Sequence, residues 1–277
     1  MREDALIKLI RDTSTSLPDD VEKALRRAAR KESRGSSARV VLDTILENIA
    51  LARGGATPLC QDTGTLAFYV DAASRRKIPP ARIKAAVAAA TGKGWLRKNC
   101  IDPVSGVSYD DNCAPGAPVI HYEEGLGRGV VRLIMKGGGS ENMSRQYSLP
   151  DETLGAGRDL EGVRRCVLDA VEKTLGYGCA PGILGVCIGG DRATAYEVAK
   201  RQLFRPLDDS SPDAQLAKLE RRILKEANSL GIGPMGLGGK TTLLGVKIAG
   251  RPRVPASFFV TVAYMCWACR RREAKIV

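Results

Sequence analysis

Histidine is almost absent from this sequence, because His121 is the only one among 277 residues. Hydrolytic triads, histidine-rich zinc sites and imidazole relays need more than one histidine, so the sequence argues against these classes. Aromatic residues make up only 5% of the chain. No apolar run approaches the roughly 18 residues that span a bilayer, and the opening residues 1–4 do not begin a signal peptide. We therefore expect a soluble, cytoplasmic protein.

The chain is rich in positively charged residues and contains eight cysteines. It carries 43 Lys and Arg against 31 Asp and Glu, a net charge of +12, which favours anionic partners such as small carboxylates or nucleic acid. In a cytosolic chain of this size, cysteine is more often a core residue, a metal ligand or a reactive thiol than half of a disulfide. The eight cysteines are Cys60, Cys100, Cys113, Cys166, Cys179, Cys187, Cys266 and Cys269.

Hydrophobic periodicity predicts a mixture of helices and strands. The length alone allows about two domains or one large one, and we expect a single domain over residues 1–277. The segment 205–212 is a possible linker by composition, and the run Arg270 to Arg272 has the look of a solvated tail. We predict an α+β fold, mostly helical with small antiparallel sheets. Helices are expected within 1–56 and at 82–91, 159–175, 191–203 and 212–229; strands are expected at 117–122 and 129–135 as an antiparallel pair, and at 242–248 and 257–264.

Four scattered segments combine glycine with polar or sulfur-bearing side chains. Residues 58–65 (PLCQDTGT) place a thiol, an amide and a carboxylate side by side, and residues 136–142 (KGGGSEN) have three glycines that let backbone N–H groups approach an anion. Residues 178–185 place Cys179 at a turn before an apolar strand. Residues 231–242 superficially resemble a phosphate-binding loop, but Pro234 stands where that pattern needs glycine. A buried cysteine, an Asx turn and flexible loops explain the same letters.

Cysteine thiolates also hold iron–sulfur clusters, and a cluster with only three of them leaves one iron open as a Lewis acid. Taken together, the four segments and residues 255–257 leading to Cys266 and Trp267 resemble the class I iron–sulfur fumarate hydratase and tartrate dehydratase family. The resemblance covers nearly the whole chain. It is to the α subunit, or N-terminal half, of that family, and it implies the corresponding iron–sulfur hydro-lyase fold.

This resemblance implies a site and a reaction. A [4Fe–4S] cluster would be bound by Cys60, Cys179 and Cys266, leaving Cys269 spare and the other four cysteines to the core. The implied reaction is reversible hydration or dehydration of a C4 dicarboxylic acid, with fumarate and malate expected first. The residues implied to bind substrate are Gln61, Asp62, Arg97, Gly137, Gly138 and Gly139, with Asp62 also catalytic.

Two departures from the family pattern bear on function. The family commonly has Arg-His-Pro-Ala-Ser before its third cysteine, whereas Val254 stands here in the histidine position, and His121 is no obvious replacement. The missing histidine allows another carboxylate-binding group, a different substrate such as tartrate or mesaconate, or a weakly active subunit. Single-chain members also carry a C-terminal half. The resemblance therefore implies a separate β subunit in an α2β2 assembly.

Two other classes of function remain as alternatives. A non-catalytic cluster-binding scaffold subunit is compatible with Val254. A basic nucleic-acid-binding protein is supported only by the net charge, since no binding motif accompanies it. We expect neither nucleic-acid nor membrane binding.

Overall fold

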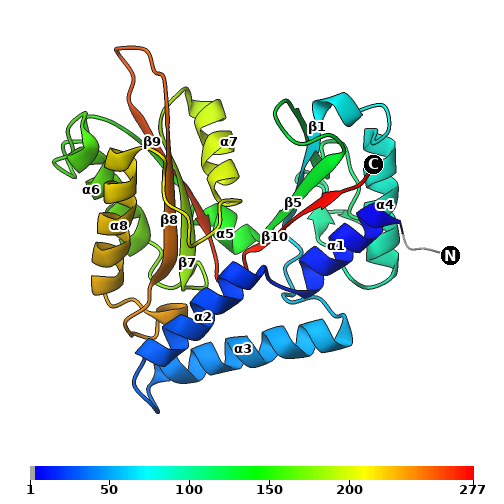
Figure 1. Ribbon diagram of the computed structural model, residues 1–277, viewed down its shortest axis with the longest axis horizontal. Helices are drawn as coiled ribbons and strands as arrows, with labels where there is room; N and C mark the ends of the chain where they lie inside the picture. The colour runs from blue at the N-terminus through cyan, green and yellow to red at the C-terminus, as the bar shows by residue number, and fades with distance from the viewer. Residues whose placement is uncertain (1–3) are drawn as a thin grey trace. The chain divides into compact units, whose positions relative to one another are not determined.

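The computed structural model describes residues 4–277, so Met1, Arg2 and Glu3 of the expected helical segment lie outside the described residues. The chain forms two compact units (Figure 1). Unit 1 comprises residues 4–18, 47–138 and 268–277, and unit 2 comprises residues 19–46 and 139–267. Within residues 4–277, no helix combines the length and apolar character required to cross a membrane.

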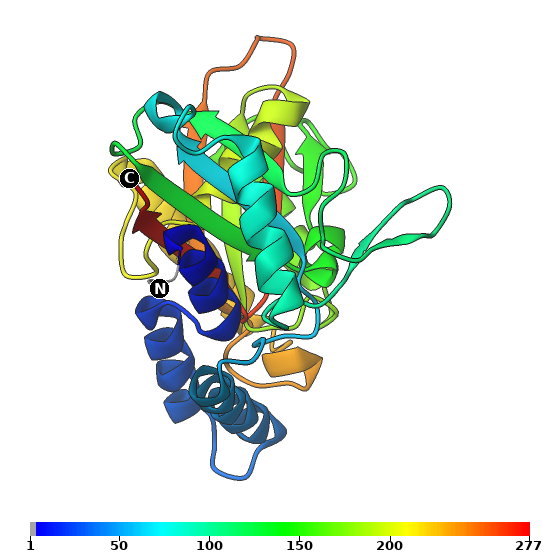
Figure 2. The same ribbon diagram turned by 90° about the vertical axis from the view of Figure 1, so that its right-hand side faces the viewer.

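Unit 1 is built on a four-stranded mixed sheet with the order β10-β5-β1-β4. The central strand β1 is parallel to β4 and antiparallel to β5, and β10 extends the sheet antiparallel to β5. The strands are β1 (Thr65–Asp71), β4 (Val119–Glu123), β5 (Val130–Lys136) and β10 (Arg270–Lys275). A small hairpin, β2 (Cys100–Ile101) with β3 (Ser108–Tyr109), projects from the rest of unit 1 in Figure 2.

The sheet of unit 1 buries its apolar side chains against α1 (Ala5–Thr15) and α4 (Pro80–Gly92). Asp4 caps α1, because its carboxylate accepts a hydrogen bond from the Leu6 amide at 2.8 Å. Leu6, Phe68 and Leu133 are fully buried in this core. The short helix η1 (Ala72–Ser74) follows β1.

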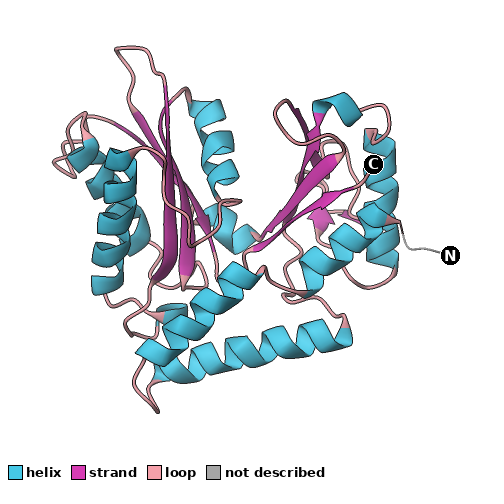
Figure 3. Ribbon diagram, in the orientation of Figure 1, coloured by secondary structure: helices cyan, strands magenta, loops and turns pink. Residues whose placement is uncertain are grey.

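Unit 2 contains a second four-stranded mixed sheet with the order β6-β9-β7-β8. Strand β7 is central and fully buried, as its apolar sequence predicts; it is parallel to β8 and antiparallel to β9. The strands are β6 (Arg145–Ser148), β7 (Gly182–Gly189), β8 (Leu243–Arg251) and β9 (Phe259–Met265). In Figure 3 they lie between layers of helix within the unit.

Helices cover both faces of the unit 2 sheet. In Figure 1, α7 (Arg192–Gln202) lies on one face, and α6 (Leu160–Glu172) and α8 (Ala214–Ser229) lie on the other. Helix α2 (Asp19–Lys31) and the short helix η2 (Pro234–Gly236) also belong to unit 2. The chain passes between the units four times: at residues 18–19, within α3 (Ser37–Gly55), within α5 (Gly138–Asn142) and at residues 267–268.

The positions of most helices and strands follow the sequence expectations, but four expectations were wrong. Strands β4 and β5 do not pair, because β1 lies between them. The two four-stranded sheets are mixed rather than antiparallel, since each contains one parallel pair. Helix accounts for 39% of the structure, so the fold is not mostly helical. The arginines at 270–272 are not a solvated tail: they begin β10, and Arg270 is only 2% exposed.

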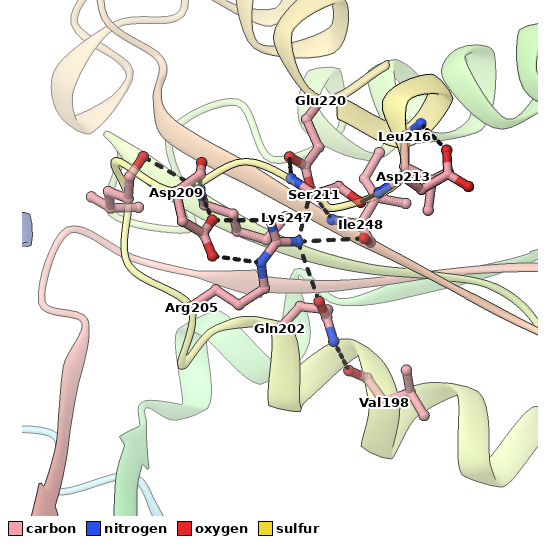
Figure 4. A network of polar contacts seen from close by, with 11 residues as sticks. Val198, Gln202, Arg205, Asp209, Ser211, Asp213, Leu216, Glu220, Lys247 and Ile248 are labelled. Carbon is pink, nitrogen blue, oxygen red and sulfur yellow. Dashed lines mark hydrogen bonds and ion pairs between the residues drawn. The ribbon is translucent and has the colours of Figure 1, made fainter. Parts of the chain in front are cut away.

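A network of ion pairs and hydrogen bonds joins the segment 205–212 to α8 and β8 in unit 2 (Figure 4). Glu220, 5% exposed, pairs with Arg205 at 2.8 Å and accepts a hydrogen bond from the Ile248 amide at 2.7 Å. Lys247, 3% exposed, pairs with Asp209 at 2.7 Å. Burial raises the pKa of the Asp209 carboxyl, but hydrogen bonds and the charges of Arg205 and Lys247 outweigh burial and hold this pKa below its ordinary value. The segment 205–212 thus lies inside unit 2 and is tied to its sheet.

Replacing Glu220 by alanine removes one of the two carboxylate partners of the half-buried Arg205 and the acceptor of the buried Ile248 amide. We expect Glu220→Ala to lower the free energy of unfolding by about 2 kcal/mol, because the Ile248 amide stays buried without an acceptor and Arg205 keeps only Asp209. Urea denaturation checks this value. Asp43→Ala, which breaks only an exposed pair with Arg39, is the control and should cost less than about 1 kcal/mol. Equal effects of the two substitutions would contradict the assignment.

Candidate active site

The polar loop at residues 60–64 leads into β1 and is anchored in unit 1 by hydrogen bonds. Buried Thr63 donates from Oγ1 to the Arg97 carbonyl at 2.8 Å and accepts from the Arg97 amide at 2.9 Å. The Asn48 side chain holds the Leu59 carbonyl at 3.0 Å. These bonds fix the loop beside the segment that carries Arg97.

Asp62 is the most heavily hydrogen-bonded residue of this loop. Its Oδ2 accepts from the Gly138 amide at 2.6 Å, and its Oδ1 accepts from Asn99 Nδ2 at 3.1 Å. Its carbonyl oxygen accepts from Arg270 Nη2 at 2.7 Å. The half-buried carboxylate is therefore held in one orientation, with a donor on each oxygen.

Two glycines are needed for this arrangement. Gly64 has φ of +74°, and a Cβ there would lie 2.4 Å from the Lys136 carbonyl oxygen. At Gly137 a Cβ would lie 2.7 Å from Asp62 Oδ2. The end of β5 and the 60–64 loop can approach this closely only because both positions lack a side chain.

The polar side chains of Gln61 and Arg97 belong to the same part of unit 1 as Asp62. Arg97 Nη1 donates to Gln61 Oε1 at 3.4 Å, and both side chains are exposed. A guanidinium beside an amide and a carboxylate is suited to binding one end of a small carboxylic acid. Thus, the structure brings together Gln61, Asp62, Arg97, Gly137 and Gly138, five of the residues expected from sequence to bind substrate; Gly139 belongs to unit 2.

A cavity of about 310 Å³ opens beside Asp62 within unit 1. A volume of this size accommodates a small organic acid. Asp62, Asn99 and Gly138 contribute to its wall, and the remainder comes from residues 64–66, 100–101, 112 and 117–119.

Asn99 and Asn112 are site residues that sequence reasoning missed. Asn112 is buried with φ of +60°, and its Oδ1 accepts from the Asn99 amide at 3.0 Å and the Cys100 amide at 3.2 Å. Its Nδ2 donates to the Arg97 carbonyl at 2.9 Å. Asn112 thus shapes the segment that presents Arg97 and Asn99. No spacing signal in the sequence connects it to Asp62.

In unit 2, sheet pairing brings Cys179 and Cys266 to the same end of two strands. Cys179 lies three residues before β7, and Cys266 directly follows β9. Since β7 and β9 are antiparallel, with Ile183 opposite Met265, the start of one lies beside the end of the other. The Trp267 amide donates to the Cys179 carbonyl at 3.2 Å, and the Cys266 amide donates to Ser140 Oγ at 3.1 Å.

Tyr264 packs inside the turn that carries Cys179. A Cβ at Gly178 would lie 2.4 Å from the Tyr264 ring, and one at Gly182 would lie 2.5 Å from it. Burial raises the pKa of the Tyr264 phenol above its ordinary value, and the nearby Cys266 and Cys179 thiols raise it further. Cys179 itself has φ of +52°, a strained conformation of the kind that clusters at functional sites.

The eight cysteines differ in burial. Cys60, Cys179 and Cys266 are half-buried, whereas Cys166, Cys187 and Cys269 are buried. Burial raises the pKa of Cys166 to about 12 and that of Cys187 to about 11, so these two thiols are inert core residues. The proposed ligands thus belong to the more accessible group, which also includes Cys100 and Cys113.

The donor set of the three expected ligands is divided between the units. Cys60 lies in unit 1, and Cys179 and Cys266 lie in unit 2. Among residues 4–277, no three His, Cys, Asp or Glu side chains form a group that would hold a metal ion. The placement of two half-buried cysteines at one end of the sheet fits the sulfur ligation of an iron–sulfur cluster.

Four large apolar side chains are exposed close to Cys179 in unit 2. Leu175 is 65% exposed, Tyr177 76%, Met235 42% and Leu237 60%. Their segments touch through the backbone, because a Cβ on Gly176 would lie 2.5 Å from the Cα of Gly236. We call these four side chains the apolar patch. An exposed cluster of this kind is typical of an interaction surface.

Val254 and His121, the two residues weighed for the histidine position of the family pattern, lie in different units. Val254 lies in unit 2, between β8 and β9, and is 64% exposed. His121 lies on β4, where its ring stacks on Tyr69 at a centroid distance of 4.9 Å.

Comparison with known proteins assigns the chain to a family. The chain matches the family described as fumarate hydratase (Fumerase) over residues 3–275, and it belongs to that family. It is 47% identical to a Geobacillus stearothermophilus protein whose name assigns it to fumarate hydratase class I; the match covers 97% of this chain but 53% of the relative. The chain thus spans about half the length of that relative.

Two other relatives match over most of their length. A Methanocaldococcus jannaschii protein, assigned by name to L(+)-tartrate dehydratase subunit alpha, is 34% identical over 99% of this chain and 96% of the relative. The L(+)-tartrate dehydratase subunit alpha of Escherichia coli K12 is 30% identical, over 93% of this chain and 85% of the relative.

The close approach at Gly64 yields a test of the loop geometry. We expect Gly64→Ala to lower the free energy of unfolding by more than about 2 kcal/mol, because the positive φ costs roughly 1 kcal/mol and the clash with the Lys136 carbonyl adds to it. Gly116→Ala is the matched control, since Gly116 has φ of +77° with open space around it. Equal losses in urea denaturation would show that the close approach does not exist.

Proposed function

We propose that this chain is the α-type component of a hydro-lyase that reversibly hydrates and dehydrates a C4 dicarboxylic acid, with fumarate and malate as the expected pair. The observation that carries the proposal is the oriented Asp62 carboxylate at a cavity of about 310 Å³, with Arg97 and Gln61 beside it. Membership of the fumarate hydratase family supports it. Tartrate and mesaconate-type acids are the alternative substrates.

The proposed cofactor is a [4Fe–4S] cluster held by Cys60, Cys179 and Cys266. Bound through three thiolates, such a cluster supplies an open iron that polarises a substrate C–O bond as a Lewis acid. The assignment is supported by the half-buried state of the three cysteines and by the position of Cys179 and Cys266 at the same end of the paired strands β7 and β9.

The chain's own residues would bind and orient the acid. Arg97 offers a guanidinium to one carboxylate, with Gln61 alongside as a second hydrogen-bonding group. Asp62 keeps its carboxylate aimed by the Gly138 amide and Asn99, so that a free lone pair on either oxygen can hold the proton of a water or hydroxyl group. The polar wall of the cavity itself includes Asp62, Asn99 and Asn112.

A separate β-type chain is the proposed partner, in an α2β2 assembly. Two relatives matched over most of their length carry names of alpha subunits, and the Geobacillus relative is about twice as long as this chain. The apolar patch next to Cys179 is the surface that we assign to this partner, because four exposed apolar side chains gain free energy when covered.

A non-catalytic, cluster-binding scaffold is the second candidate function. It is favoured by Val254, which can neither donate a hydrogen bond nor carry charge at the position where the family commonly has histidine. A hydro-lyase and a scaffold would both bind the cluster, but only the hydro-lyase would convert substrate.

The test uses the chain co-purified with its β-type partner and reconstituted anaerobically with iron and sulfide. We expect fumarate–malate interconversion by the complex and little by the chain alone. Cys60→Ala, Cys179→Ala and Cys266→Ala should each lose iron and activity, since each removes one thiolate ligand. Iron and sulfide analysis and substrate absorbance are the measurements.

Cys113→Ala is the control for these three variants, because Cys113 is also half-buried but donates to the Lys84 carbonyl. It should keep its iron and its activity. A reconstituted complex that holds the cluster but turns over neither fumarate, tartrate nor mesaconate would favour the scaffold. Strong turnover by the purified chain alone would overturn the need for a partner.

The apolar patch gives a separate prediction for the partner. We expect the double substitution Tyr177→Ser with Leu237→Ser to weaken partner binding by about tenfold or more, because buried aromatic and aliphatic anchors dominate interface energies. Isothermal titration calorimetry measures this. Leu51→Ser removes another exposed side chain, 67% accessible on α3, and should leave the affinity unchanged. Equal affinities for all variants would place the partner elsewhere.

A further inference from the structure

Arg270 is a buried cation next to the proposed cluster-binding loop. It begins β10 opposite Met135 of β5 and is only 2% exposed, which makes it the largest fully buried side chain among the described residues. Its Nη2 donates to the Asp62 carbonyl at 2.7 Å. Asp62 lies two residues after Cys60, so Arg270 is attached to the backbone of the loop that carries the first proposed ligand.

The guanidinium of Arg270 has no carboxylate partner within residues 4–277. Among the residues that the structure describes, its side chain donates to the Asp62 carbonyl oxygen, while its buried Nε has no hydrogen-bond partner there. Burying a charge without a counterion costs several kcal/mol. Within residues 4–277, the structure therefore holds at this loop a buried positive charge that makes no direct ion pair with a carboxylate.

Buried Lys247 and half-buried Arg205 of unit 2 each have a carboxylate partner. Lys247 is 3% exposed and has Asp209 at 2.7 Å, and Arg205 has Glu220 at 2.8 Å. Arg270 differs from both, because among the described residues it has no carboxylate partner. It lies at the loop where the Cys60 thiolate and the proposed cluster would bring negative charge.

We propose that Arg270 is a positioning residue for the Cys60 loop, and that its charge offsets the negative charge of the thiolate-ligated iron–sulfur cluster. The inference rests on the proposed function. Hydrogen bonds and charges around such a cluster set its reduction potential, and residues that orient metal ligands affect retention of the metal. Arg270 would do both through the backbone of Asp62 and through its own charge.

Two readouts besides activity test this role on the full chain reconstituted anaerobically with iron and sulfide. We expect Arg270→Gln to release iron to a chelator roughly tenfold faster than the unsubstituted chain. We also expect its cluster to have a more negative midpoint potential, because removing a nearby positive charge disfavours the reduced, more negative form. Arg270→Lys should recover most of the potential, since it keeps the charge.

Arg272→Gln is the matched control. Arg272 lies on the same strand and also binds a main-chain oxygen, but its contacts are the Asp12 carbonyl at 2.9 Å and Ser16 Oγ at 2.6 Å. It should match the unsubstituted chain in iron release and potential. Thermal unfolding of the cluster-free chains separates loss of folding from loss of the cofactor.

The outcomes separate the two proposals. If the unsubstituted chain holds a cluster and Arg270→Gln behaves like Arg272→Gln in both readouts, the role of Arg270 is refuted while the proposed cofactor stands. Equal destabilisation of the cluster-free and loaded forms by Arg270→Gln, with an unchanged potential, would reduce Arg270 to a structural residue. A chain that takes up no iron and sulfide overturns both proposals.

Discussion

The antiparallel pairing of β7 with β9 is the constraint on which the cysteine chemistry of unit 2 depends. Cys179 and Cys266 are 87 positions apart in the sequence, and they meet only because one strand starts where the other ends. Tyr264 fills the space beneath the turn, and glycines on both sides of Cys179 admit its ring. A one-residue slip in this register would send Cys266 to the opposite face of the sheet. The same pairing thus supports the core and positions two thiols.

In unit 1, the position of Asp62 depends on the close approach of two backbone segments. The 60–64 loop lies against the end of β5 where Gly64 and Gly137 leave room, and Asp62 collects donors from Gly138 and Asn99. Each of these contacts joins segments distant in sequence. The carboxylate is consequently pre-oriented before any ligand binds, which is a property expected of an active-site acid or base.

Local sequence patterns predicted much of the secondary structure, because helices such as α3, α4 and α8 have apolar residues at helical spacing with clear ends. Strand partners were harder: the apolar segments of β4 and β5 were recognised, but a hairpin-like spacing hid the insertion of β1 between them. Arg270 was misread for a physical reason. A run of arginines near a terminus normally favours solvent, and only the pairing of β10 with β5 buries it.

In the candidate site, too, some residues were predicted from the sequence and others were found only in the structure. Gln61, Asp62 and Arg97 were predicted from the family resemblance, and the structure brings them together in unit 1. Asn99, Asn112 and Arg270 were not, because each acts through a backbone or side-chain bond formed only in the folded chain. The candidate site therefore consists of a few residues that can be recognised from sequence motifs. The residues that hold them in place belong to no such motif.

The Mössbauer spectrum of the iron-loaded complex, recorded before and after adding fumarate, tests the central claim most directly. Three thiolate ligands on a four-iron cluster leave one iron chemically distinct, and the account predicts that fumarate changes the signal of that iron alone. A spectrum that shows equivalent irons, or one that fumarate leaves unchanged, would contradict it.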